Sequence, residues 1–164
     1  MDTSQVTNMT QMFYGCAALT TVPDMDTSKV TSMTSMFSGC SSLTSVPDMD
    51  TSKVTDMSSM FYNCAALTSV RLTDCGKVIE APSFILSNTP NITTVALTRL
   101  GDGITNYYGR SVDCTTTALS PDGANTLMDS LGTPTQAVPL KLPTTATGCD
   151  TTKATAKRWT VTTG

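Results

Sequence analysis

The cysteines are the residues of this chain whose type and spacing come nearest to a chemical pattern. Cys16, Cys40 and Cys64 lie 24 residues apart. A thiol can act as a nucleophile, a metal ligand or half of a disulfide, but side chains in parallel register point the same way rather than toward each other. We therefore expect reduced, buried thiols, each donating its weak S–H to a turn carbonyl within its own repeat.

The other reactive residue types form no catalytic constellation. The sequence has no histidine, which removes the Ser-His-Asp and Cys-His arrangements and the common zinc sites. No two cysteines have C-x-x-C spacing, and Gly101 and Gly103 belong to no phosphate loop. In an oxidising setting Cys114 could pair with Cys149, and buried free thiols are the alternative. We predict a protein that is not an enzyme and that holds no cofactor and no metal.

The recurring aspartates suggest a calcium-binding site as an alternative. Four of them would lie close together if the repeats stack: Asp24, Asp26, Asp48 and Asp50. Their spacing matches neither the EF-hand loop nor the calcium-binding nonapeptide, and Lys29 and Lys53 could neutralise them. We instead expect the Asp-Thr-Ser runs to close turns through bonds from side chain to backbone.

These positions belong to a 24-residue unit that occurs three times without a gap, over residues 1–24, 25–48 and 49–72. Fixed periods of this length are typical of solenoids, in which each unit buries its apolar face against its neighbours. The apolar spacing within a unit is neither helical nor alternating, so no unit is a single helix or strand. In the second unit it predicts a short strand at 43–47, an extended edge at 30–33 and about one helical turn at 34–39.

Stacked units would place equivalent residues roughly 4.8 Å apart, so each apolar position is expected to form an internal ladder. The ladders are Met9/Met33/Met57, Met12/Met36/Met60, Phe13/Phe37/Phe61, Leu19/Leu43/Leu67 and Val22/Val46/Val70. Methionine suits an irregular core, and a methionine-lined ligand groove is the alternative. The first unit would leave Val6, Met9 and Phe13 facing water, so we expect a flanking domain or another subunit to cover it.

The unit D-T-S-x-V-T-x-M-x-x-M-F-x-x-C-x-x-L-T-x-V-P resembles the BspA-like leucine-rich repeat of bacterial surface proteins, which also occurs in phage tail and other virion proteins. The resemblance covers residues 1–72 and implies an adhesive extracellular protein rather than an enzyme. A second pattern, L-S-x-x-x-x-N-x-L-x-x-S-L-G followed by G-C-D-x-x-x-A-x-x-K-x-W-T-V, resembles the C-terminal closing segment of the same proteins.

The rest of the chain departs from the regular pattern. Residues 85–95 overlay residues 60–70 with one residue inserted upstream, and Thr89 replaces the ladder cysteine. We expect a strand at 92–100 and a further strand with an aromatic tip at 104–114. Helices are expected at 121–131 and 151–157, and strands at 137–142 and from Trp159 onward. Trp159 is the expected core anchor of the C-terminal cap. We predict an α/β solenoid, a right-handed leucine-rich-type coil of short strands and helical turns. Regular repeats at 1–72 and divergent repeats at 73–114 are closed by a C-terminal α/β cap at 115–164.

The charge and hydropathy of the sequence limit the classes of partner that we expect the protein to bind. A net charge of −3 offers no basic footprint for nucleic acid. No apolar run reaches 18 residues, and the N-terminus lacks the layout of a signal peptide, so we expect no membrane insertion. The expected location is extracellular, on a bacterial cell surface or a phage virion, reached as part of a larger protein or on a particle released by lysis.

The predicted function is adhesion or receptor binding, with a cell-surface glycan or protein as the partner. Rows of hydroxyls with scattered aromatics suit ligands held by many weak contacts. The candidate ligand-binding residues are Thr21, Ser45, Ser69, Thr94, Arg71, Tyr14, Tyr62, Tyr107 and Tyr108. A structural or decoration component that docks through its first unit is the alternative, and an ice-binding threonine surface is a third reading.

Overall fold

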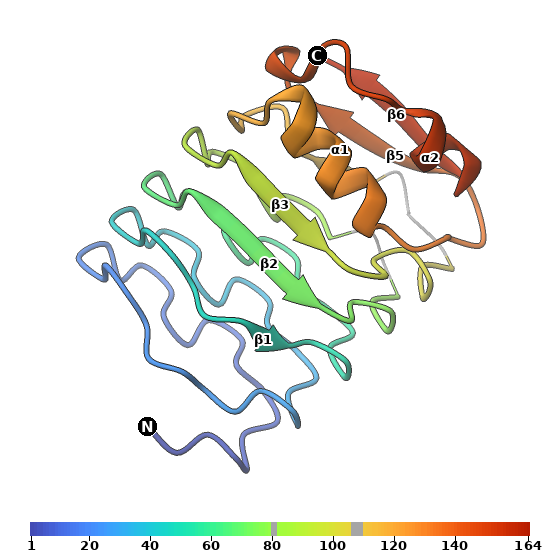
Figure 1. Cartoon of the computed structure of the whole chain (residues 1–164). Helices are drawn as coiled ribbons and strands as arrows, with labels where there is room; N and C mark the ends of the chain where they lie inside the picture. The colour runs from blue at the N-terminus through green and yellow to red at the C-terminus, as the bar shows by residue number, and fades with distance from the viewer. Residues whose placement is uncertain (80–81, 106–109) are drawn as a thin grey trace.

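The computed structural model describes residues 1–79, 82–105 and 110–164. In chain order its elements are β1 (Met49–Asp50), β2 (Ser69–Thr73), β3 (Thr94–Leu97), β4 (Val112–Asp113), α1 (Pro121–Ser130), β5 (Val138–Leu142), the 3₁₀ helix η1 (Thr144–Ala146), α2 (Thr152–Ala156) and β6 (Trp159–Thr163). The strands form two parallel sheets of three strands, ordered β1-β2-β3 and β4-β5-β6. The three repeats follow one another from the N-terminal end, and the helices and the second sheet occupy the other end (Figure 1).

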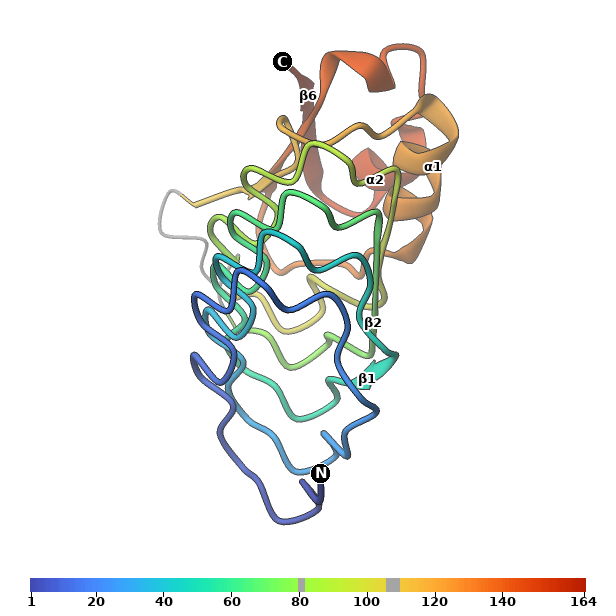
Figure 2. The ribbon, with the colours of Figure 1, turned by 90° about the vertical axis from the view of Figure 1, so that its left-hand side faces the viewer.

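Successive repeats are joined at equivalent positions by backbone hydrogen bonds. The Met9 N–H donates to the Ser32 carbonyl at 3.0 Å, and the Met33 N–H donates to the Asp56 carbonyl at the same distance. In the sheet, Ser69 of β2 lies opposite Thr94 of β3. The strands β1 and β2 lie along one side of the repeats and a series of turns along the other (Figure 2). Equivalent side chains therefore lie next to each other, as the ladders require.

The helical turn predicted at 34–39 is wrong, because two residues of the segment have left-handed backbone. Ser35 has φ 54° and Gly39 has φ 80°. The Met36 N–H bonds back to Met33 within the repeat, whereas the Ser35 N–H bonds across to Ser58 of the next repeat. Left-handed residues interrupt a right-handed helix. The segment is instead a chain of tight turns stitched to its neighbour.

The strand predicted at 43–47 of the second repeat is also wrong, because β1 covers only Met49–Asp50, at the start of the third repeat. In the third repeat β2 runs over Ser69–Thr73. Pro47 has no N–H to donate to a ladder, and Arg71 stands at the equivalent position of β2, where the N–H is present. The edge expected at 30–33 reduces to single bridges that Ser32 makes with Asn8 and Asp56.

The apolar ladders form the core where a repeat has neighbours on both sides. Met33, Met36, Phe37 and Leu43 are fully buried, and so are their third-repeat equivalents Met57, Met60, Phe61 and Leu67. The Phe37 ring stacks between Phe13 and Phe61, with centroids 5.5 and 5.7 Å apart. In the first repeat Met9 is only 1% exposed, so the expectation that it faces water is wrong. Val6 and Phe13 are partly buried, and Met12 is 36% exposed.

The polar atoms inside the repeats are satisfied by bonds that cross from one repeat to the next. The Cys40 thiol donates to the Phe13 carbonyl at 3.0 Å, and the Cys64 thiol donates to the Phe37 carbonyl at 3.1 Å. Cys40 and Cys64 are buried and free as expected, but their acceptors lie in the preceding repeat rather than in their own. Cys16 is free but exposed, so the expectation that it is buried is wrong. A second buried ladder was not anticipated: the hydroxyl of Thr27 donates to the Asp50 carbonyl at 2.9 Å.

The C-terminal elements cover the last repeat. Helix α1 lies alongside β3, where the Ser130 hydroxyl accepts the Leu97 N–H at 3.0 Å (Figure 1). Gly123 allows this approach, because a Cβ there would collide with the Thr93 carbonyl. Trp159 is 2% exposed and its Nε1–H donates to the Gly132 carbonyl at 2.9 Å, so its predicted role as a core anchor is confirmed.

Candidate functional site

The outward hydroxyls predicted as ligand contacts are exposed and ordered in register. Thr21, Ser45, Ser69 and Thr94 are all exposed, and Ser69 pairs with Thr94 across β2 and β3. Arg71 is exposed on β2 opposite Ala96. Among the described residues these four hydroxyls have no hydrogen-bond partner. They are available to an external ligand but form an open surface rather than an enclosed site.

The neighbouring threonines differ, because their hydroxyls are used inside the protein. One position earlier in each repeat, the hydroxyls of Thr44, Thr68 and Thr93 donate to the carbonyls of Thr20, Thr44 and Thr68, at 3.2 to 3.4 Å. On another edge, Thr31 and Thr55 make the same bonds to Thr7 and Thr31. Many of the threonines therefore connect repeats, and their abundance does not by itself indicate a binding surface.

Two of the predicted tyrosines lie in one groove, which we call the tyrosine groove. Its volume is about 360 Å³ and its aromatic lining is Tyr14, Tyr62 and Phe84. Its polar lining is Gln11, Ser35, Ser38 and Ser59. None of the outward sheet residues lines it. The predicted site residues Tyr107 and Tyr108 lie outside the described residues.

The backbone of the turns positions this lining. Gln11, Ser35, Ser59 and Phe84 are the equivalent residues of four successive repeats, and all have left-handed φ, between 54° and 58°. Phe84 enters this file because of the one-residue insertion before residue 85. Sequence reasoning missed Phe84 and the serines, although the alignment of 85–95 with 60–70 already placed Phe84 beside Ser59. The missing information was that this position is a turn whose side chain points outward.

Aromatic contacts and exposure show which groups of the tyrosine groove are open to a ligand. Tyr62 and Phe84 cross edge to face, with centroids 6.5 Å apart and planes at 79°. Tyr14 and Phe84 are each 59% exposed, which is high for such large apolar rings. Ser38 is only 5% exposed, and its hydroxyl has no partner among the described residues. The groove thus combines exposed ring faces with a recessed hydroxyl that has no protein partner among the described residues and still reaches solvent.

The cysteines beneath the repeats are unsuited to nucleophilic chemistry. Burial raises the pKa of the Cys64 and Cys114 thiols to about 12 and that of Cys75 to about 11. Burial also raises the pKa of Cys40. Since the thiolate is the reactive form, these thiols are inert at neutral pH. Cys114 and Cys149 are both free, so the alternative of a disulfide between them is not realised in this structure.

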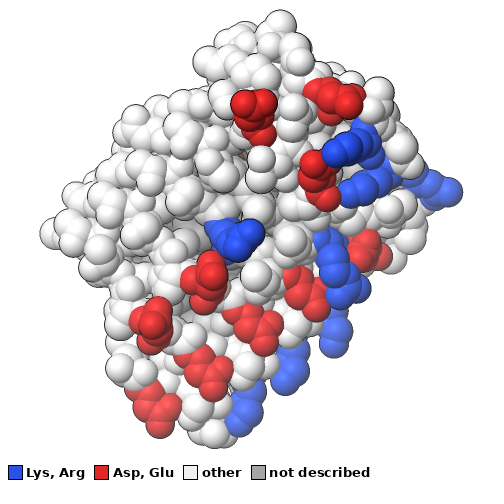
Figure 3. Space-filling model, viewed as in Figure 1, with Lys and Arg blue, Asp and Glu red and all other residues white. Residues whose placement is uncertain are grey.

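The aspartates act in turns. Asp2, Asp26 and Asp50 each accept the N–H of the serine two residues later, at 2.9 to 3.0 Å. Hydrogen bonds from these serines lower the pKa of each carboxyl from its ordinary value of 3.8. Acidic and basic side chains follow the repeats in neighbouring rows on the face that carries β1 to β3 (Figure 3). Among the described residues, no three His, Cys, Asp or Glu side chains come together as metal ligands.

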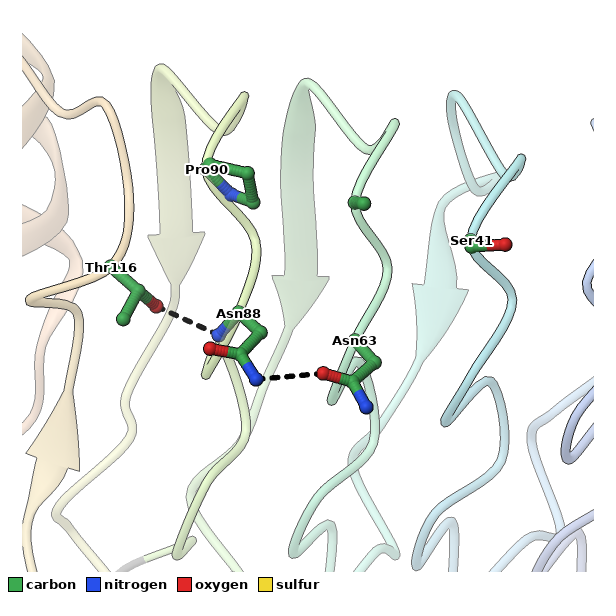
Figure 4. Close-up of a pocket in the computed structure, with 6 residues that line it drawn as sticks. Ser41, Asn63, Asn88, Pro90 and Thr116 are labelled. Carbon is green, nitrogen blue, oxygen red and sulfur yellow. Dashed lines mark hydrogen bonds between the residues drawn. The ribbon is translucent and has the colours of Figure 1, made fainter.

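Two other hollows lie on the surface, and some of their polar side chains bond to each other. One, of about 410 Å³, is lined by Asn63, Asn88 and Thr116 among others. There the Asn88 amide donates to Asn63 and the Asn88 N–H donates to Thr116, both at 2.8 Å (Figure 4). The other lies beyond Phe84 and contains the ion pair between Lys141 and Asp113, whose N···O distance is 3.5 Å. The tyrosine groove is the strongest candidate site, because among these three hollows it alone combines several aromatic side chains with hydroxyls that have no partner among the described residues.

Comparison with known proteins identifies the family. The family described as "Mycoplasma protein of unknown function, DUF285" matches residues 1–92, which include all three regular repeats, and the chain belongs to it. No curated protein and no solved structure shows a significant match. In the part of the chain that the structure describes, no helix has the length and apolar character needed to cross a membrane.

Proposed function

We propose that this chain is a non-enzymatic adhesion or receptor-binding module. In this proposal the repeats are a BspA-like, leucine-rich-type solenoid closed by the C-terminal α/β segment, displayed on a bacterial cell surface or a phage virion. The observation that carries the proposal is the tyrosine groove, where exposed aromatic rings surround hydroxyls that have no partner among the described residues. Its ligand is a glycan or a protein of the target cell.

The contrast with the rest of the surface supports the proposal. Several polar side chains elsewhere on the repeats, such as those of Thr44 and Thr68, complete bonds between neighbouring repeats. Clefts with aromatic walls and a few free polar groups are the usual form of ligand sites. The outward file of Thr21, Ser45, Ser69 and Thr94, with Arg71 beside it, can add weak contacts to a large ligand.

Binding of the fluorescently labelled chain to intact bacteria tests this proposal. Saturable binding is the expected result, and treating the cells beforehand with periodate or with protease separates a glycan receptor from a protein receptor. Absence of saturable binding across a broad panel of strains, from a chain shown to be folded and monomeric, would overturn it.

A structural role is the second candidate, and the outer edge of the first repeat favours it. The carbonyls of Ser32 and Thr34 accept N–H groups of the preceding repeat, whereas the equivalent carbonyls of Asn8 and Thr10 accept none from the described residues. Phe13 and Leu19 are only partly buried there. A flanking domain or subunit with a similar edge would pair with it. Concentration-dependent self-association in sedimentation would support this role, and a monomer at all concentrations would oppose self-docking.

A further inference from the structure

We propose that the tyrosine groove binds an uncharged, extended oligosaccharide that lies across the repeats, with Tyr14 at one end and Tyr62 and Phe84 at the other. This inference rests on the proposed binding function and names its ligand class. Four observations carry it: the spacing of the rings, their exposed faces, the unpartnered hydroxyls and the lack of charge.

The spacing of the aromatic side chains follows the step between repeats. That step is visible in the phenylalanine ladder, whose ring centroids are 5.5 and 5.7 Å apart. Tyr14 and Tyr62 occupy equivalent positions two repeats apart, and Ser38 occupies that position between them. One sugar ring of an extended chain spans about one such step. The groove can therefore place one ring on Tyr14, one over Ser38 and one against Tyr62.

The exposed rings suit the apolar faces of pyranoses. An aromatic face carries negative charge density and attracts the slightly positive C–H bonds on one side of a sugar ring. Tyr14 is 59% exposed, so its face is accessible. The crossed rings of Tyr62 and Phe84, at 79°, form a corner that closes the groove at its far end. A flat sugar ring fits such a corner with one face on a ring and its rim against the other.

The hydroxyls of the groove suit a ligand that both donates and accepts hydrogen bonds. Ser38 is 95% buried yet has no partner among the described residues, and the side chains of Gln11, Ser35 and Ser59 have none either. A recessed polar group must bond to water or to a ligand, because leaving it unpaired is unfavourable. A sugar hydroxyl can replace such a water and reproduce its bonds.

The lining also argues against charged ligands and peptides. Among the described residues, no Asp, Glu, Lys or Arg lines the tyrosine groove, so a charged ligand would lose hydration there without forming an ion pair with them. An extended peptide is usually held by pairing with free backbone groups. Here the Phe37 N–H bonds to Met60 and the Gly39 N–H bonds to Tyr62. Those groups are occupied by the next repeat, which leaves side chains as the binding elements.

A glycan array followed by titration calorimetry tests the inference. The array carries uncharged β-linked hexasaccharides of glucose and of N-acetylglucosamine, with oligogalacturonate as the charged counterpart. We expect binding to uncharged members only. Tyr14→Ala and Phe84→Ala should each weaken it at least tenfold and Ser38→Ala severalfold. Ser41→Ala, which alters an exposed serine in a different hollow, should leave it unchanged.

Binding to no uncharged glycan, or equal binding by Tyr14→Ala and the unaltered chain, would overturn the inference. Thermal unfolding of each variant confirms that it is folded, and Phe84→Ala, which alters an exposed ring, provides a second test if Tyr14→Ala is unstable. Saturable binding to cells that survives periodate and is lost after protease treatment, together with no binding on the array, would leave the proposed function standing and remove the glycan. Absence of any saturable cell binding by the unaltered chain would overturn both the proposed function and the glycan inference.

Discussion

Two sets of hydroxyls on the same repeats have opposite roles. The hydroxyls of Thr44 and Thr68 donate to carbonyls of the preceding repeat and connect the structure. The hydroxyls that line the tyrosine groove, such as that of Ser38, have no partner among the described residues. Both sets come from one repeated sequence and have the same chemistry. Their positions in the repeat separate connection from recognition.

The difference follows from the backbone beneath each set. In the connecting ladder each threonine lies where its hydroxyl reaches the carbonyl 24 or 25 residues earlier. In the groove, left-handed turns at Ser35 and Ser59 direct side chains away from the neighbouring repeat. A regular array can therefore supply its own stability along some files and leave another free for a ligand. Substitutions in the two files of residues are therefore expected to have different effects on stability and on ligand binding.

The largest contrast is expected for thiol reactivity. Cys64 is fully buried with a pKa raised to about 12, whereas Cys16 of the same ladder is exposed. Cys64 can react only after the fold opens, so we expect it to be modified more than about a thousandfold more slowly than Cys16, in line with usual folding equilibria. Mass spectrometry after timed labelling with a thiol reagent measures both rates. Comparable rates would show that the repeats are not packed as described.

The next contrast uses one residue type in two places. Phe37→Ala removes a fully buried ring from the ladder and should lower the free energy of unfolding by about 3–5 kcal/mol. Phe84→Ala removes a ring that is 59% exposed in the groove and should change it by less than about 0.5 kcal/mol. Urea unfolding of both variants makes the comparison. Similar losses would mean that Phe84 is structural.

A smaller effect separates the hydroxyls themselves. Thr27→Val removes the bond from a buried hydroxyl to the Asp50 carbonyl and should lower the free energy of unfolding by about 1 kcal/mol. Ser38→Ala removes a hydroxyl without a partner among the described residues and should leave stability nearly unchanged while weakening ligand binding. Chemical denaturation paired with calorimetry tests both. A stability loss from Ser38→Ala equal to that from Thr27→Val would break the distinction.

The smallest effects concern pH. Hydrogen bonds from serines lower the folded-state pKa of Asp2, Asp26 and Asp50 below 3.8. Their stabilisation is therefore present above that value and is lost as pH falls through the folded pKa. The free energy of unfolding should be flat from pH 5 to 8 and decline below about pH 4. Ligand binding should not vary between pH 5 and 8, since the sequence has no His and no Asp or Glu among the described residues lines the groove. Binding that changes with pH in this range would point to a charged contact elsewhere.

The sequence alone was sufficient for the features that repetition dictates. The ladders at Met33, Phe37 and Leu43 followed from the 24-residue period, because equivalent residues of stacked units must touch. The Asp-Thr-Ser turns and the Trp159 anchor followed from local preferences and burial tendencies. The N-terminus of α1 followed from Ser120 and Pro121, and the structure shows the Ser120 side chain accepting the Gly123 N–H.

Features that depend on local backbone could not be inferred. Serine gives no signal for a left-handed φ, so Ser35 was placed in a helical turn that does not exist. The direction of the Cys40 thiol depends on which repeat supplies the nearer carbonyl, which a one-dimensional pattern does not show. Of the residues that line the groove, the sequence indicated only Tyr14 and Tyr62 as ligand contacts. The other residues are of common types, and their exposure depends on the conformation of the turns.

Cell binding by paired variants tests the central claim most directly. The chain carrying Tyr14→Ala and Phe84→Ala is compared with one carrying Thr21→Ala and Ser69→Ala, both shown to be folded, for saturable binding to a bacterium that binds the unaltered chain. The account predicts that the groove variant loses binding and that the sheet variant retains most of it. Full binding by the groove variant would contradict the assignment of the tyrosine groove as the site of recognition.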